Sequence, residues 1–478
     1  MTQPQRIART TRLLVPLSFG GALVVTTLWA ALSNPVGGDF VAYALPSANF
    51  IRGGVLSLPQ LGTQYDLDKY WRFNAPLLGA GPSIPFALFG VSHTTYLGGL
   101  LALAATSLTG LLALCRKAIG GASAVWLPAA IGVLLIRSVH SVELVNQRYS
   151  ILAPLAVGLL FFPTRRERDG GRAAGWKWLL AGVLPLLHPA LLPASVVWVL
   201  FEFAACLKSW SLPHWGSVAL GVGVGCCAWW YLSPPGFRVQ FLPHLYSREF
   251  VPFSGWDQAA SWKYALPSQL TQGLIIAWAV VALPTSWRDS QRVRVLACLA
   301  IALLLDASGR MVYLGYYVVG LAPAILAMHR DRGGSRWVAV CLGCLAVANV
   351  AVFAKLSTTP PRLPTSEATI EGFVMTHTRD GDRICLGPPF ILLASKRRLA
   401  GERELPYVVP TALYLRHFDE QQFLHAIRTH CTCYVGDPAI YRAVQRYYKM
   451  ESAPVFETAD FVETVFEGQP ILIARAKQ

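Results

Sequence analysis

Charged residues are scarce in this chain of 478 residues. Asp, Glu, Lys and Arg make up only 14% of it, whereas 54% of the residues are hydrophobic and the mean hydropathy is +0.43. Soluble domains carry about 25% charged residues. A soluble protein of this length would expose too much of such an apolar surface to water. The composition excludes an ordinary soluble protein and predicts an integral membrane protein.

Acidic residues are the scarcest charged type, with 26 Asp and Glu against 41 Lys and Arg and a net charge of +15. Such an excess is also found in nucleic-acid-binding proteins. Here, however, the Lys and Arg fall in short clusters between apolar runs and do not line one amphipathic face. We interpret the clusters as topology signals and predict no nucleic-acid partner.

Several motifs of soluble enzymes and carriers are missing from the sequence. It has no Walker-type or dinucleotide-binding glycine motif. Cys431-Thr-Cys433 lacks the second Cys or His pair that a zinc site requires. The sequence also lacks an internal repeat of the kind that many transporters show. No nucleotide, zinc or repeat-based transport mechanism is therefore indicated.

About eleven membrane spans are predicted from the apolar runs. The first follows Arg6, Arg9 and Arg12 and is longer than the apolar core of a signal peptide, so we predict an uncleaved span and a cytoplasmic N-terminus. Several runs are short, which favours tilted or broken helices around a cavity. The predicted spans are 13–32, 93–115, 122–136, 150–162, 176–187, 190–207, 217–232, 267–287, 295–305, 313–328 and 337–354.

Segment 75–90 decides the topology, because it is short and contains Pro76, Pro82 and Pro85. If it does not cross the membrane, the basic clusters that follow all lie on the side of the N-terminus, as the positive-inside rule requires. We therefore predict that it lies at the outer surface, within a large first outer loop (33–92), and that the C-terminus is outside the cytoplasm.

The composition changes after residue 355. We predict a membrane domain over 1–355 and a small extracytoplasmic α/β domain over 356–478 that follows a Pro-rich linker. Strands are expected at 383–386, 433–436 and 470–474, and helices at 418–429 and 438–448. Of the ten cysteines, Cys385, Cys431 and Cys433 lie in this domain, so Cys385 can pair with either of the other two.

Four predicted outer loops gather carboxylates, cations and His on one face. A carboxylate base beside cations near a membrane surface suits chemistry on a lipid phosphate. Asp39 stands out, because it follows the first span between glycines and aromatic residues. The other polar residues of these loops that we consider are Tyr43, Asp66, Asp68, Glu143, Arg148, His244, Arg248 and Arg310.

In the order of these elements the chain resembles the GT-C glycosyltransferases that use polyprenyl-phosphate sugars, which include bacterial aminoarabinose transferases and protein O-mannosyltransferases. The acidic outer loop comes first and a Pro-containing juxtamembrane helix second. Departures are Phe40, where the family often has a second acid, and Asn74-Ala75 in the Pro helix. The matching segments are Gly38-Asp39-Phe-Val-Ala-Tyr43, Tyr70-Trp-Arg-Phe-Asn-Ala-Pro76, Phe241-Leu-Pro-His244-Leu-Tyr-Ser-Arg248 and Ser308-Gly-Arg310 through Tyr316 to Pro323.

The resemblance implies an inverting hexosyl- or pentosyltransferase in a bacterial inner membrane. It would move a sugar from a polyprenyl-phosphate carrier to a lipid, glycan or protein acceptor at the outer face. Asp39 is the expected base, and Arg310, Arg248 and Arg148 are expected at the donor phosphate. The single acid favours a metal-independent reaction, although Mg²⁺ or Mn²⁺ stays open. Substrate contacts are expected from Tyr43, His244, Glu143, Asp66, Asp68 and Tyr316.

Other interpretations stay open from sequence. Gly38-Asp39 before an apolar run is also a good helix start. Arg310 and Arg248 also suit interfacial anchors, and His188 and His244 suit structural roles. A transporter or flippase of a lipid-linked substrate, or a non-catalytic scaffold of the same fold, are the competing classes. Glu202 is the one acid inside an apolar span, which burial or the nearby cytoplasmic end would explain.

Overall fold

A computed structural model describes parts of both predicted domains. Its chain divides into two compact units, and each is described by itself. One unit comprises described residues within 100–328, and the other comprises those within 43–99 and 365–476. The described residues are 43–59, 76–119, 149–164, 167, 174–207, 216, 219–221, 223, 225, 227, 290–307, 314–328, 365–387, 389–396, 407–408, 427–438, 441–442, 456 and 459–476.

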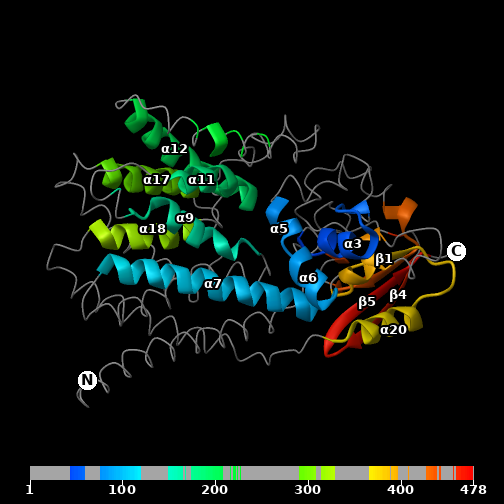
Figure 1. Ribbon diagram of the computed structural model, residues 1–478. Helices are drawn as coiled ribbons and strands as arrows, with labels where there is room; N and C mark the ends of the chain where they lie inside the picture. Colours follow the sequence, from blue (N-terminus) through cyan, green and yellow to red (C-terminus); the bar gives the residue numbers. More distant parts are fainter. Residues whose placement is uncertain are drawn as a thin grey trace, which may run out of the picture. The chain divides into compact units, whose positions relative to one another are not determined.

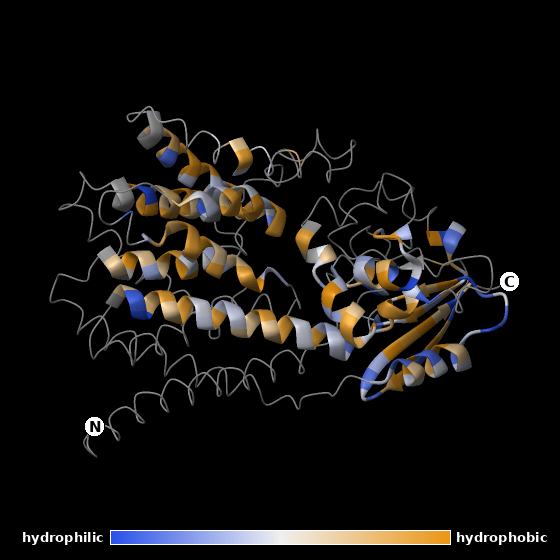
Figure 2. Ribbon diagram, viewed as in Figure 1, coloured by the Kyte–Doolittle hydropathy of each residue, from blue (hydrophilic) through white to orange (hydrophobic). Residues whose placement is uncertain are grey.

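The first unit is built from apolar helices (Figures 1 and 2). Each predicted span that falls in well-described residues is helical there, and the spans at 13–32, 122–136, 267–287 and 337–354 lie outside the described residues. The helices are α7 (His93–Ile119, in this unit from Leu100), α9 (Ala153–Phe161), α11 (Gly175–Leu187), α12 (Leu192–Leu207), α17 (Ser290–Ala307) and α18 (Leu314–Met328).

Among the described residues, α7 is the one helix long and apolar enough to cross a membrane. The other segments of this unit contain shorter apolar helical stretches of 10–17 residues. Two of them begin with 3-10 turns, η4 (Tyr149–Leu152) before α9 and η5 (Pro189–Leu191) before α12. The expectation of short helices is confirmed for α9 and α11, whose two ends are both described. The number of spans and the sidedness of the chain stay predictions.

Glycines allow the helices of this unit to approach closely. On α9, a Cβ added at Gly158 would lie 3.1 Å from the carbonyl oxygen of Gly320 on α18. A Cβ added at Gly182 of α11 would overlap the carbonyl oxygen of Gly221. A Cβ added at Gly225 would lie 2.5 Å from the carbonyl oxygen of Gly182. Gly221 and Gly225 stand four residues apart, which is the small-residue spacing that brings membrane helices into backbone contact.

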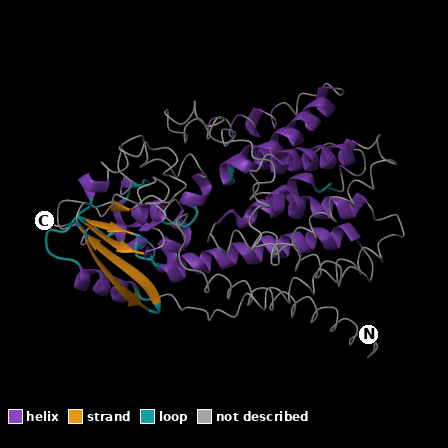
Figure 3. Cartoon of the chain, turned by 180° about the vertical axis from the view of Figure 1, so that it is seen from behind, coloured by secondary structure: helices purple, strands orange, loops and turns teal. Residues whose placement is uncertain are grey.

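The second unit contains a five-stranded sheet in the order β2-β1-β3-β5-β4 (Figure 3). β1 is parallel to β2 and β3, whereas β5 is antiparallel to β3 and β4. The parallel strands confirm the α/β character predicted for this part of the chain. The strands are β1 (Ile384–Leu386), β2 (Tyr407–Val408), β3 (Cys433–Gly436), β4 (Asp460–Phe466) and β5 (Gln469–Arg475).

Strands β1, β3 and β5 confirm the predicted ones, but β2, β4 and the helix α20 (Glu367–His377) were not expected. β4 is mostly exposed and therefore lacks a buried apolar run. Its hairpin with β5 turns at Glu467 and Gly468, which both have positive φ. Such a two-residue turn matches the twist of paired strands. The predicted helices at 418–429 and 438–448 lie mostly outside the described residues.

Aromatic rings pack α20 to the sheet. The Phe373 ring lies parallel to that of Phe390 at 5.6 Å and against that of Phe466 at 4.6 Å. Ser366 caps the helix by accepting a hydrogen bond from the Thr369 backbone N–H. A separate cluster of buried residues includes Tyr434, Tyr441 and Phe456.

Part of the predicted first outer loop (33–92) belongs to this second unit. It contributes α3 (Leu45–Gly53), α5 (Pro76–Ala80) and α6 (Ser83–Phe89). Segment 75–90 is thus two short helices separated at Gly81-Pro82, each far too short to cross a bilayer. Contacts group these helices with the described C-terminal residues in one compact unit.

Candidate functional site

Most predicted site residues lie outside the described part of the chain. The exceptions are Tyr43 and Tyr316. Tyr43 is 1% exposed and lies in the core two residues before α3 begins. The predicted residues outside the described ranges are Asp39, Asp66, Asp68, Glu143, Arg148, His244, Arg248 and Arg310.

Tyr316 lies in a buried polar cluster of the first unit, which we call the helical unit. Its hydroxyl donates a hydrogen bond to Ser150 Oγ in η4 at 3.0 Å. Its ring meets the His188 ring edge to face, with 5.8 Å between the centroids. Ser150, His188 and Tyr316 are each at most 3% exposed. The structure thus brings together one predicted residue and two that were not among the predicted site residues. We call these three residues the polar cluster.

Proline and backbone contacts fix the His188 ring. His188 ends α11 in extended backbone, and Pro189 begins η5 directly after it. The backbone N–H of Ala190 donates to His188 Nδ1 at 3.2 Å, so a neutral ring carries its proton on Nε2. Tyr317 of α18 donates to the carbonyl oxygen of the same Ala190. The Tyr317 hydroxyl therefore holds the break between α11 and α12 against α18.

The polar cluster lies at the end of the helical unit where α9, α12 and α18 begin. The opposite end carries ion pairs. There Lys177 Nζ donates to Glu167 and to the Phe162 carbonyl oxygen, both at 2.8 Å. Glu202 pairs with Arg294 at the same end. The two ends thus differ in chemistry: hydroxyls and an imidazole at one, paired charges at the other.

Sequence reasoning gave His188 a structural role and did not single out Ser150. Both positions nevertheless carried a signal. His188 is an isolated polar residue in Leu187-His188-Pro189, between two apolar runs, and Ser150 follows Arg148-Tyr149 at the start of another. Polar residues at such breaks tend to face a shared interior.

The described residues contain no group of three or more His, Cys, Asp or Glu side chains placed to hold a metal ion. Asp39, Asp66, Asp68 and Glu143, the acids expected near the reaction, are outside the described residues. The metal independence of the reaction therefore stays a prediction.

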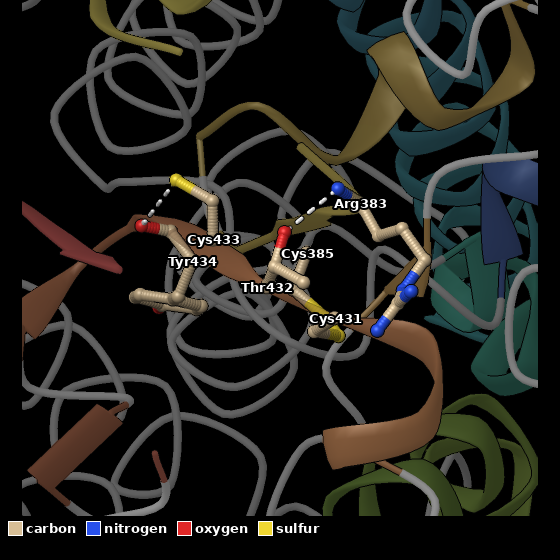
Figure 4. Close-up of a disulfide and its surroundings, with 6 residues drawn as sticks. All are labelled: Arg383, Cys385, Cys431, Thr432, Cys433 and Tyr434. Carbon is tan, nitrogen blue, oxygen red and sulfur yellow. Dashed lines mark hydrogen bonds between the residues drawn. A yellow bond between two sulfur atoms is a disulfide. The ribbon is translucent and has the colours of Figure 1, made fainter. Parts of the chain in front are cut away.

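The second unit contains a disulfide between Cys385 and Cys431, which settles the choice that the sequence left open (Figure 4). Cys433 stays free and buried. Thr432, between the two cysteines, accepts a hydrogen bond from the Arg383 backbone N–H at 2.9 Å and ties this turn to β1. Burial, with Asp382 nearby, raises the pKa of the Cys433 thiol to about 12.

Apolar helices joined to an α/β unit define a membrane protein with an accessory domain. No family model matches the chain, and neither does any curated protein sequence. Among solved structures it is similar to ArnT from Cupriavidus metallidurans bound to undecaprenyl phosphate. That match has 16% identity and a TM-score of 0.53 and covers 96% of this chain and 97% of the other.

Two further structures match less closely. The apo form of the same ArnT has 15% identity and a TM-score of 0.49, with 98% of each chain covered. Arabinofuranosyltransferase AftD from Mycobacteria has 13% identity and a TM-score of 0.45, and the match covers 96% of this chain and 40% of AftD. The likeness to the lipid-bound ArnT shows the fold. The chain thus has the fold of this ArnT, the GT-C fold that its sequence resemblance predicted.

Proposed function

We propose that the protein is a membrane glycosyltransferase that takes a sugar from a polyprenyl-phosphate carrier and transfers it to a lipid, glycan or protein acceptor. The observation that supports this most is the fold match along nearly the whole chain to an ArnT structure that holds undecaprenyl phosphate. The order of the acidic loop, the Pro-containing segment and the late Arg and Tyr segment supports the same class.

In the proposed reaction Asp39 takes the proton of an acceptor hydroxyl. The acceptor oxygen then forms a bond to the anomeric carbon while the bond from that carbon to the phosphate oxygen breaks. The lipid phosphate leaves with the electron pair, and Arg310, Arg248 and Arg148 compensate its charge. A single displacement of this kind inverts the anomeric configuration.

The polar cluster supports this placement of the phosphate site. Arg148 directly precedes Tyr149 of η4, and Arg310 stands four residues before Leu314, where α18 begins. Four residues span at most about 14 Å. Two of the proposed phosphate ligands are thus tethered to the end of the helical unit that holds Tyr316, Ser150 and His188. We propose that Tyr316 contributes to the substrate site through this buried hydrogen bond.

The location proposed for this chemistry is the outer face of a bacterial inner membrane. The disulfide between Cys385 and Cys431 supports an oxidising compartment for the C-terminal domain. Together with a cytoplasmic N-terminus, this location requires an odd number of spans, as the eleven proposed would give.

The test compares wild-type protein with Asp39→Asn in transfer from labelled polyprenyl-phosphate sugars. General-base catalysis contributes about 10²- to 10⁴-fold, so we expect a loss of that size in kcat with donor binding retained. Asp380→Asn, which changes an exposed acid of the C-terminal domain, is the matched control. Unchanged transfer by Asp39→Asn would remove Asp39 as base. A wild-type protein that is inactive with every such donor would favour the transporter or scaffold alternatives.

Metal dependence is tested in the same assay. We propose a metal-independent reaction, so treatment with EDTA should leave the rate unchanged. A rate that is lost with EDTA and restored by Mg²⁺ or Mn²⁺ would instead assign the outer-loop acids to a divalent ion.

A further inference from the structure

Arg52 connects several segments of the second unit that are far apart in sequence. It stands in the last turn of α3. One of its terminal nitrogens donates to Glu367 Oε1 of α20 at 2.5 Å and to the Val91 carbonyl oxygen at 3.4 Å. The other donates to Ser395 Oγ and, at 3.4 Å, to the Leu392 carbonyl oxygen, both in the 3-10 turn η9 (Ile391–Ser395). One side chain thus joins the first outer loop, the segment before α7 and the C-terminal domain.

The acceptors around Arg52 are arranged for a guanidinium group. A planar fork with several N–H donors can serve four acceptors in different directions, whereas the compact ammonium of Lys cannot span them. Glu367 is held in turn by Lys396, at 3.5 Å, and Lys396 also pairs with Glu371 at 2.6 Å. The side chains of Arg52 and Glu367 are 21% and 24% exposed, so the network is partly shielded from water.

The opposite end of α3 leads to the proposed base. Tyr43, Ala44 and Leu45 are at most 1% exposed, so the start of the helix is fixed by burial. Ser47 adds a hydrogen bond to the Gly79 carbonyl oxygen of α5 at 2.7 Å. Asp39 stands four residues before Tyr43, within about 14 Å along the chain. Along the chain, most of α3 therefore lies between Arg52 and Asp39.

We propose that Arg52 is a positioning residue through which the C-terminal domain fixes α3 and, with it, the Asp39 loop. This inference rests on the proposed function. In it the C-terminal domain is part of the catalytic unit and not an appended binding module. A loss of Arg52 should leave the protein folded but the base displaced, and misplacement by about 1 Å can cost about 100-fold in rate.

The experiment compares Arg52→Ala, Arg52→Lys and Glu367→Gln in full-length protein, with kcat, donor KM, melting temperature and amide hydrogen exchange as readouts. We expect kcat of Arg52→Ala to fall about 10- to 100-fold with donor KM nearly unchanged, and exchange to rise in α3. Arg52→Lys keeps the charge but loses the planar guanidinium fork. Its kcat should therefore lie between those of wild type and Arg52→Ala. Arg442→Ala is the matched control, because Arg442 pairs with Glu463 in the same unit but both are largely exposed.

The outcomes separate positioning from general stability. A merely structural role would raise exchange throughout the unit and lower the melting temperature in step with activity. Wild-type kcat in Arg52→Ala, or unchanged exchange in α3, would overturn the proposal. If wild-type protein transfers no sugar from any polyprenyl-phosphate donor, the proposed function fails and so does the catalytic part of this inference. The exchange data then decide separately whether Arg52 anchors α3.

Discussion

Glu202 on α12 forms an ion pair with Arg294 on α17, and the two side chains are 7% and 11% exposed. The Arg294 guanidinium also lies 5.9 Å from the centre of the Phe201 ring. This pairing explains how an acid is accommodated inside an otherwise apolar helix, because a buried charge is tolerated where an opposite charge meets it.

Breaking this pair should destabilise the protein strongly. Arg294→Met leaves the Glu202 carboxylate buried without its partner, which typically costs about 3–5 kcal/mol. The measurement is unfolding of the purified protein in detergent. The matched control is the double variant Glu202→Leu with Arg294→Met, which buries no charge and should recover most of the loss. If Arg294→Met alone were as stable as wild type, this result would contradict a buried ion pair.

A second prediction concerns the contact between α9 and α18. A Cβ at Gly320 would lie 2.6 Å from Val157 Cβ and 2.7 Å from the Pro154 carbonyl oxygen. Gly320→Ala must therefore move the helices apart, and we expect a loss of about 1–3 kcal/mol in stability. Gly98→Ala on α7 is the control, because no atom lies within 4 Å of its added Cβ. Equal unfolding curves for the two variants would contradict the close approach.

The hydrogen bond within the polar cluster gives a third prediction. Tyr316→Phe and Ser150→Ala each remove one partner, so each should cost about 0.5–1.5 kcal/mol in unfolding free energy. The double variant should cost less than the sum, because both changes remove the same bond. Tyr317→Phe, which loses a different bond, should be nearly additive with Ser150→Ala. Full additivity of Tyr316→Phe with Ser150→Ala would show that the two hydroxyls do not interact.

The sequence predicts best where one strong pattern decides the structure. The predicted span 93–115 corresponds to α7 because an unbroken apolar run ends at Arg116 and Lys117. β4 was missed because its exposed residues carry no buried face. α20 was missed because only Val374 in it is buried.

Contacts across the chain could not be predicted in the same way. Arg52 and Glu367 are 315 residues apart, and nothing local in either segment indicates the other. The choice between Cys431 and Cys433 depends on strand register, because Cys433 pairs with Ile384 in the sheet while Cys431 precedes the strand. Tyr316 was predicted from a resemblance, but its partners Ser150 and His188 come from two other segments.

The disulfide supplies a fourth prediction. Cys385 and Cys431 are 46 residues apart, so in the chain-entropy description their bond stabilises the folded domain by about 4 kcal/mol. Cys431→Ala should therefore lower the stability of the C-terminal domain by about that amount. Cys433→Ala should leave the bond intact, and mass analysis of non-reduced peptides reports the pairing. A bond from Cys385 to Cys433 in wild-type protein would contradict the structure.

Cys433 should be chemically inert although it lies beside this disulfide. Its raised pKa of about 12 leaves almost no thiolate at pH 8, and thiolate is the reactive form, so iodoacetamide should modify it only after denaturation. The thiol's usual pKa is 9.0, so the folded domain holds this proton more tightly than the unfolded chain does. Stability should accordingly fall as the pH rises from about 9 to about 12, and less so in Cys433→Ala. Rapid labelling of native protein at pH 8 would show instead that the thiol is accessible and ionised.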